Sequence, residues 1–187
     1  MKKIKYILIA IVIITIVAVV FYFVGGKIDK DANLSGPTNS STNGVGDKEL
    51  TEIYTNDIYN FTLKYPKGLV VSTFPSLDET GDVVLISNMG TGNGMQIFIS
   101  SYDRTEDVLT IEGVKSDLPT LVMVEPKDMV VGKVGGGISF LDSAGNSTTT
   151  NRQVWFSAYG WLYQITAPIT FDDTLNKVLN SWEFTVK

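Results

Sequence analysis

Residues 59–68 read YNFTLKYPKG, and this stretch has the alternation of a β-strand. Its large apolar side chains, Phe61, Leu63 and Tyr65, fall on one face, and the polar side chains between them fall on the other. Residues 66–68, Pro-Lys-Gly, then supply the turn that ends the pattern. The stretch therefore predicts the first core strand of a folded domain.

The chain begins with lysines and a long apolar segment. Three Lys side chains precede residues 6–24, which contain no charged residue. At a rise of about 1.5 Å per residue, about 19 helical residues span a hydrocarbon core of about 30 Å. We predict that residues 1–24 are a cytoplasmic start followed by a transmembrane signal-anchor helix. The protein would then cross the cell membrane once, with its C-terminal domain outside the cytoplasm. A cleaved signal peptide is the alternative, although its apolar part is usually shorter.

A polar segment follows the apolar one. Residues 25–50 are rich in Gly, Ser, Thr and Asn and contain few large apolar side chains. Such a segment cannot bury enough apolar surface to offset the entropy that it would lose on ordering. We therefore predict a flexible tether, and we assign residues 51–187 to a single folded domain.

The composition excludes several kinds of chemistry. The 187 residues include no Cys and no His, which removes disulfides, thiol catalysis, Ser-His-Asp hydrolysis and His-containing zinc sites. Residues 49–187 carry nine Lys or Arg and seventeen Asp or Glu, a formal charge of −8. An acidic domain is a poor partner for nucleic acid, whose phosphates attract basic surfaces. We predict no nucleic-acid partner and assign no cofactor.

The domain alternates between short apolar runs and turn residues, which indicates strands. Short connections favour antiparallel pairing, so we predict an α+β domain with a mainly antiparallel sheet. The predicted strands are Phe61–Tyr65, Leu69–Ser72, Val83–Ser87, Met95–Ser101, Met129–Val134, Gly137–Leu141, Gln153–Ala158, Trp161–Ala167 and Glu183–Val186.

Two segments have the pattern of helices. Residues 105–107, a threonine followed by two acids, predict the start of a helix that ends before Pro119. A second helix is predicted through Leu179, with Thr170 or Asp172 as its N-cap. Both helices would cover part of the sheet.

In this order, the elements resemble the PsbP-like/Mog1 superfamily. Its bacterial members open with a segment similar to residues 59–68, but with Gly where Asn60 stands here and Trp where Leu69 stands. The sequence Ser-Trp-Glu-Phe at 181–184 also resembles the end of these domains. The resemblance covers nearly all of residues 51–187, and it implies an αβα sandwich around an antiparallel sheet.

The superfamily is functionally mixed. Plant members support photosystem II, Mog1 binds a small GTPase, and many bacterial members are exported proteins without an assigned activity. The resemblance supplies no shared catalytic residues. Together with the predicted anchor and tether and the absence of His and Cys, the resemblance leads us to expect a non-catalytic, membrane-anchored binding or assembly module with an unidentified protein partner. An exported carboxylate-dependent hydrolase and a self-associating cell-surface structural protein remain as alternatives.

The aromatic stretch 155–163 is the densest candidate for a contact surface. With a period of two, Trp155 and Phe156 fall on opposite faces of their strand, so both faces of this hairpin are partly apolar. One face belongs to the core, and the other is either covered by a helix, which we favour, or exposed as a contact surface. In the exposed alternative, Trp155, Tyr159 and Trp161 are the candidate contact residues for a protein or glycan partner.

Two other patterns resemble ligand sites. Residues 90–94 are glycine-rich like a phosphate-binding loop, but they lack the Gly-Lys-Ser/Thr ending and precede a strand, so we predict a hairpin turn. Acidic residues gather at 78–82, 103–107 and 172–173, and such oxygen ligands suit Ca²⁺. None of these sets matches an EF-hand loop, and helix capping and solvation explain the last two. We therefore predict no metal site.

Overall fold

The computed structural model describes residues 49–75, 81–88, 90–102, 109–133, 135–142 and 150–185. Within these ranges the chain forms ten strands, two α-helices and one short 3-10 turn. The strands are β1 (Leu50–Asn56), β2 (Phe61–Pro66), β3 (Val70–Pro75), β4 (Gly81–Ser87), β5 (Gly94–Ser101), β6 (Val124–Val131), β7 (Gly135–Asp142), β8 (Asn151–Ala158), β9 (Trp161–Pro168) and β10 (Glu183–Phe184). The helical elements are α2 (Ile111–Asp117), the 3-10 turn η1 (Ile169–Phe171) and α3 (Asp172–Asn180).

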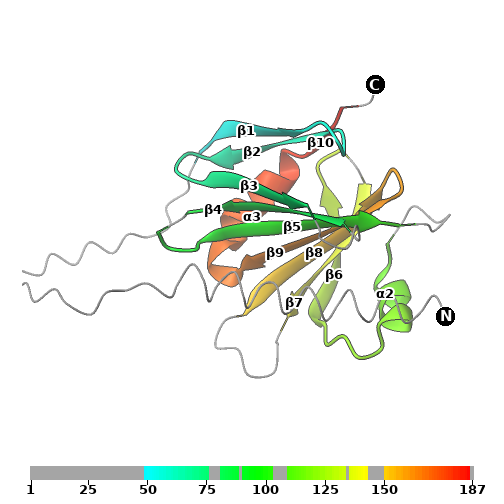
Figure 1. Ribbon diagram of the computed structural model, residues 1–187. Coiled ribbons are helices and arrows are strands. Elements are labelled where there is room, and N and C mark those ends of the chain that lie inside the picture. Colours follow the sequence, from blue (N-terminus) through cyan, green and yellow to red (C-terminus); the bar gives the residue numbers. More distant parts are fainter. Residues whose placement is uncertain are drawn as a thin grey trace, which may run out of the picture.

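The strands form two antiparallel sheets (Figure 1). The larger sheet has seven strands in the order β3-β4-β5-β9-β8-β7-β6, and the smaller one has three in the order β1-β2-β10. Every observed pairing within both sheets is antiparallel. The predicted mainly antiparallel sheet is confirmed, and each predicted strand overlaps an observed one. Its division into two sheets was not predicted.

The stretch 59–68 supplies β2, the middle strand of the smaller sheet. Phe61 and Leu63 are fully buried and Tyr65 is half-buried, as the alternation predicts. β1 pairs along one side of this strand and β10 along the other. The structure places a strand at Leu50–Asn56 that was not predicted, and its first residue, Leu50, is the last residue assigned to the tether.

The main core lies between the two sheets and α3. Phe61 stacks on Trp182 with ring centroids 4.4 Å apart, and Phe156 stacks on Tyr163 at 4.8 Å. The apolar stripe of α3 packs into the same core. The described residues of this cluster that are fully enclosed include Ile86, Ile97, Ile99, Ile165, Leu175, Val178 and Leu179.

A second, smaller core lies on the opposite face of the large sheet. There Trp155 and Phe140 pack with Val114 of α2. Because Trp155 and Phe156 are neighbours on β8, their side chains point to opposite faces. The described helices therefore lie on opposite faces of the large sheet, with α3 beside the smaller sheet and α2 close to β6 (Figure 1).

Both helices begin differently from the prediction. The N-cap of α2 is Thr110, whose hydroxyl accepts a hydrogen bond from the amide of Gly113 at 3.1 Å. Thr110 is extended, so it interrupts the continuous helix predicted from residue 105, and residues 103–108 lie outside the described ranges. Neither predicted side-chain cap of α3 is used. Instead, the carboxylate of Asp172 accepts two hydrogen bonds from Nε and one from Nη2 of the Arg152 guanidinium.

Most of the predicted N-terminal organisation lies outside the described residues. This holds for the predicted anchor, residues 6–24, and for the tether up to residue 48, so both stay predictions. Neither helix within the described ranges has the length and hydropathy needed to cross a bilayer.

Candidate functional site

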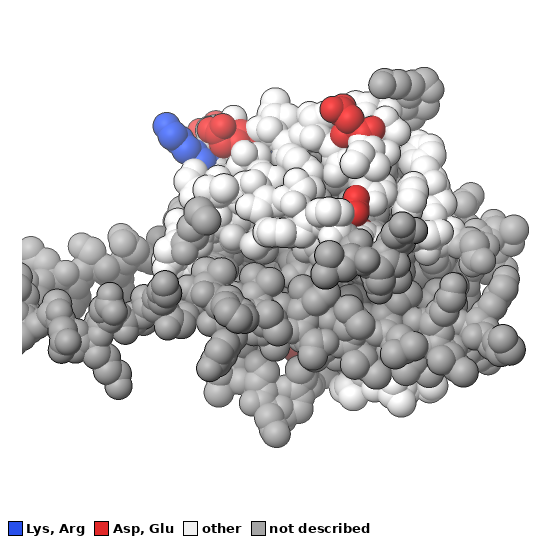
Figure 2. All heavy atoms as spheres, in the orientation of Figure 1, with Lys and Arg blue, Asp and Glu red and all other residues white. Residues whose placement is uncertain are grey.

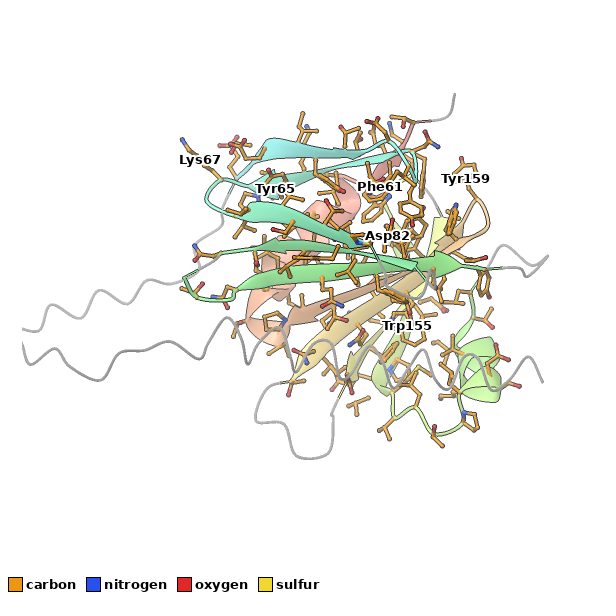
Figure 3. All side chains as sticks on the ribbon, in the orientation of Figure 1. Phe61, Tyr65, Lys67, Asp82, Trp155 and Tyr159 are labelled. Carbon is orange, nitrogen blue, oxygen red and sulfur yellow. The ribbon has the colours of Figure 1, made fainter. Side chains whose placement is uncertain are left out.

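A surface pocket of about 300 Å³ lies where the β1–β2 turn, the β8–β9 turn and the end of β10 meet. Three segments that are far apart in the sequence are brought together here by the pairing of β10 with β2 and by the β8–β9 hairpin. Figure 3 shows Tyr159 at this end of the molecule and Lys67 at the other end. The lining residues are Ile58, Tyr59, Asn60, Tyr159, Trp161, Phe184 and Thr185.

Two edge-to-face aromatic pairs build the pocket. The rings of Tyr59 and Trp161 have centroids 4.9 Å apart at an interplanar angle of 86°. The rings of Tyr159 and Phe184 have centroids 5.0 Å apart at 65°. Tyr59 is buried, whereas Tyr159 is 67% exposed, so one pair belongs to the protein interior and the other reaches into solvent. The pocket therefore presents aromatic surface to whatever enters it.

The backbone of the β8–β9 turn is left-handed at a residue that disfavours this conformation. Tyr159 has φ 51° and Gly160 has φ 80°, the signs of a two-residue type I′ hairpin turn. Asn-Gly suits such a turn, whereas a tyrosine in the left-handed region costs about 1–2 kcal/mol. An unfavourable backbone residue beside a pocket suggests a role for its side chain, here the exposed ring.

The β1–β2 turn is held by hydrogen bonds. The Asn56 Oδ1 atom accepts from the amides of Ile58 and Tyr59, both at 3.1 Å. Asn60 is also left-handed, with φ 51°, and its carbonyl accepts from the amide of Thr185 at 2.8 Å. Asn tolerates this conformation better than other non-glycine residues, so its replacement of the Gly of the related motif is physically conservative.

A hydrogen bond links the pocket to the large sheet. The Tyr59 hydroxyl donates to Oδ2 of Asp82 on β4 at 2.9 Å. Burial, followed by this hydrogen bond and the negative charge of Asp82, raises the pKa of Tyr59 above its ordinary value. Burial also raises the pKa of Tyr163, with a smaller contribution from Tyr59. Both phenols are therefore held in their neutral form.

These tyrosines predict a loss of stability at alkaline pH. Above about pH 10 the unfolded chain releases the protons of Tyr59 and Tyr163 while the folded chain retains them, so the free energy of unfolding falls. The expected fall is up to about 1.4 kcal/mol per pH unit for each tyrosine. Urea unfolding measured from pH 8 to 11 checks this, and Tyr59→Phe should make the decline shallower. An unchanged slope in that variant would contradict the assignment.

The three predicted contact residues fall into two environments. Trp155 is 7% exposed, its ring lies 5.3 Å from that of Phe140, and its Nε1 donates to Oε1 of Gln153 at 3.3 Å. The structure thus favours the helix-covered alternative for Trp155, which belongs to the second core. Tyr159 and Trp161 line the pocket, and their role in contact stays a prediction.

Trp155→Ala is expected to lower the free energy of unfolding by about 3 kcal/mol, because it opens a cavity between β8 and α2. Ile53→Ala is the matched surface control, since Ile53 is 65% exposed, and we expect a change within about 0.5 kcal/mol. Denaturant unfolding followed by fluorescence measures both. Equal effects in the two variants would show that Trp155 is not a core residue.

The remaining sequence patterns have structural roles or lie outside the described ranges. Residues 90–93 lie in the turn between β4 and β5, and Gly94 begins β5; in this turn Oδ1 of Asn88 accepts from the amides of Gly90 and Thr91 at 2.9 and 3.2 Å. The predicted hairpin turn is confirmed.

Within the described part of the chain, no three acidic side chains gather as a metal site would need. Of the predicted acidic sets, residues 78–79 and 103–107 are not described.

The comparisons with known proteins find a similar fold. No protein-family model matches the sequence, and no curated protein matches it either. The solution structure of cyanobacterial PsbP (CyanoP) from Synechocystis sp. is similar with a TM-score of 0.52 and 13% sequence identity, over 79% of this chain and 99% of that chain. At this identity the similarity shows the fold alone. The PsbP-like part of the predicted resemblance is confirmed for the fold, and the Mog1 part stays a prediction.

Proposed function

We propose that this protein is a membrane-anchored, non-catalytic binding or assembly module of PsbP-like fold, and that it holds a protein partner at the aromatic pocket outside the cytoplasm. The observation that carries the proposal is the exposed ring of Tyr159, which stands over the pocket on a strained turn. Exposed aromatic side chains beside a pocket are typical anchors of protein interfaces. The helices on opposite faces of the large sheet also support the finer comparison with an αβα sandwich of the Mog1 kind.

The anchor is supported by the sequence. Residues 6–24 are long and apolar enough to span a bilayer, and lysines precede them. The predicted tether, residues 25–50, would connect this anchor to the domain, whose first described strand begins at Leu50. Carbonate washing and external protease treatment of intact cells test this arrangement. We expect the chain to stay in the membrane and residues 49–187 to be digested from outside.

Site-specific photocrosslinking in the membrane tests the contact surface. A photoreactive phenylalanine analogue replaces Tyr159 in the full chain, and the same analogue at Ile53 is the control, since the two positions are 67% and 65% exposed. We expect a discrete heteromeric adduct from position 159 and none of that mass from position 53. No adduct at 159, or identical adducts at both positions, would refute the proposed surface. An adduct of twice the chain mass would support the self-associating alternative instead.

Tyr159→Asn is expected to separate folding from binding. Asparagine relieves the left-handed turn, whereas loss of the ring contact with Phe184 removes about 0.5–1.5 kcal/mol. The two changes oppose each other, so the free energy of unfolding should change by less than about 1 kcal/mol. Capture of the partner through a crosslinker at Ile58 should nevertheless fall. Unchanged capture at unchanged stability would contradict a role for the ring.

A further inference from the structure

We propose that the pocket receives a positively charged side chain, specifically the guanidinium group of an arginine presented by the protein partner. The inference deepens the proposed function and rests on it, because the arginine belongs to the partner held at this surface. It assigns the ligand chemistry of the pocket, which the fold similarity does not address.

The lining supplies the surface that an organic cation needs. Four of the seven lining residues are aromatic: Tyr59, Tyr159, Trp161 and Phe184. The faces of such rings carry negative potential and attract cations, and tryptophan does so best. A guanidinium group is planar and weakly hydrated, so it stacks on aromatic rings more readily than an ammonium group. An arginine therefore fits this lining better than a lysine does.

The hydrogen bond behind Tyr59 strengthens the attraction. The Asp82 carboxylate accepts a hydrogen bond from the Tyr59 hydroxyl at 2.9 Å, which polarises the phenol so that electron density shifts toward its ring. Asp82 is not itself a lining residue, but its negative charge lies directly behind the lining residue Tyr59, and Asp82 is only half-buried. A neutral apolar ligand would gain nothing from this carboxylate, whereas a cation would gain from both its charge and the polarised ring.

The charges around the pocket favour a cation. None of the lining residues is Lys or Arg. The lining residues include no Asp or Glu either, and Glu183, the chain neighbour of the lining residue Phe184, is paired with Lys133 at 2.9 Å. On the described part of the face shown in Figure 2, acidic side chains lie at both ends, and the blue basic atoms lie at the end that holds Lys67 in Figure 3. The described residues carry twelve Asp or Glu and seven Lys or Arg, so the electrostatic complement is a basic partner.

The size of the pocket favours one side chain over a folded segment. Its volume of about 300 Å³ lies at the lower end of the range for ligand pockets. The backbone on both sides is fixed, on one side by the hydrogen bonds that Asn56 accepts and on the other by the hairpin of β8 and β9. A preformed pocket loses little conformational entropy when a side chain enters.

Nuclear magnetic resonance of the full chain in a non-ionic detergent, with ¹⁵N-labelled tryptophan, tests the proposal. The probes are N-acetyl-arginine methylamide and its uncharged isostere N-acetyl-citrulline methylamide. We expect the arginine probe to shift the indole N–H signal of Trp161, with saturation at a dissociation constant on the order of millimolar. The signals of Trp155 and Trp182, both in the cores, should stay in place. The citrulline probe should bind about two- to fivefold more weakly.

Two variants at one position provide the matched control. Tyr159→Phe keeps the ring and should keep the affinity within about twofold, whereas Tyr159→Asn should weaken binding about two- to fivefold. Equal affinity for the arginine and citrulline probes would overturn the cation assignment. Tighter binding of phosphocholine than of the arginine probe would assign the pocket to a lipid headgroup and also overturn it.

The failure of this inference differs from the failure of the proposed function. If the arginine probe leaves the Trp161 signal unchanged while position 159 still crosslinks a partner, the cation assignment is wrong and the binding function stands. If the arginine probe binds but no adduct forms at position 159, the pocket accepts cations and the proposed contact with a protein partner is wrong.

Discussion

Gly132→Ala is expected to prevent stable folding, or to lower the free energy of unfolding by at least about 4 kcal/mol. Gly132 directly follows β6 and has φ 50°, a conformation that strains any residue with a β-carbon. A methyl group there would collide with the carbonyl oxygen of Trp182 and lie 2.9 Å from its carbonyl carbon. Both atoms belong to the backbone, so no side-chain rotation relieves the collision.

Gly135→Ala is the matched control for this substitution. Gly135 begins the next strand with φ 117°, and a β-carbon there would meet nothing within 4 Å. We expect only the conformational penalty, about 1–2 kcal/mol. Denaturant unfolding of both variants separates strain from collision. If both variants lost the same free energy of unfolding, the collision with the Trp182 backbone would not contribute to the effect of Gly132→Ala.

Trp182→Ala is expected to lower the free energy of unfolding by about 4–5 kcal/mol. Trp182 is 0% exposed, and its ring joins the two sheets. It stacks on Phe61 of the smaller sheet at 4.4 Å and meets Phe156 and Tyr163 of the larger sheet at 5.3 and 5.7 Å. Its loss removes the contact surface between the sheets as well as the buried area of one side chain.

Trp182→Phe is expected to cost much less, about 1 kcal/mol. The Nε1 atom of Trp182 is buried and has no hydrogen-bond partner within the described part of the chain, and an unsatisfied donor of this kind destabilises a fold by about 1–3 kcal/mol. Phenylalanine keeps an aromatic ring but buries less area than tryptophan does. Removal of the unsatisfied donor partly offsets the free energy that this loss of buried area costs. Thermal unfolding and near-ultraviolet circular dichroism check both variants. A loss below about 2 kcal/mol for Trp182→Ala would show that the ring does not join the sheets.

The strands were predictable because alternation carries direct information about burial. Phe61 and Leu63 are buried and Thr62 is less so, and the same logic placed Trp155 and Phe156 on opposite faces. β1 was missed because its apolar side chains do not alternate along the sequence. Ile53 is exposed, and the pairing with β2 shifts register between Leu50 and Glu52. Local alternation cannot reveal a strand whose register is set by its neighbour.

The helix starts were not predicted correctly, and the pocket was not predicted at all, because each depends on contacts that the sequence of a single segment does not specify. A threonine at residue 105 and Thr110 are both suitable caps, and the sequence does not say which amide each hydroxyl will meet. The pocket joins two turns to the end of β10, and only the paired sheets bring them together. One local signal was present: a Tyr159-Gly160 turn between two strands places tyrosine where asparagine is preferred.

The position of the pocket along β1 has a mechanical consequence. The chain enters at Leu50, and the residues that line the pocket follow Asn56, so the seven residues of β1 separate the two points by about 20 Å. In the proposed arrangement, in which the chain is anchored before residue 49 and a partner is bound at the pocket, a pull between the two would run along this strand. Such a load shears the β1–β2 hydrogen bonds together, whereas a perpendicular load would break them one by one. The proposed arrangement would therefore load the domain in the direction in which these hydrogen bonds resist force together.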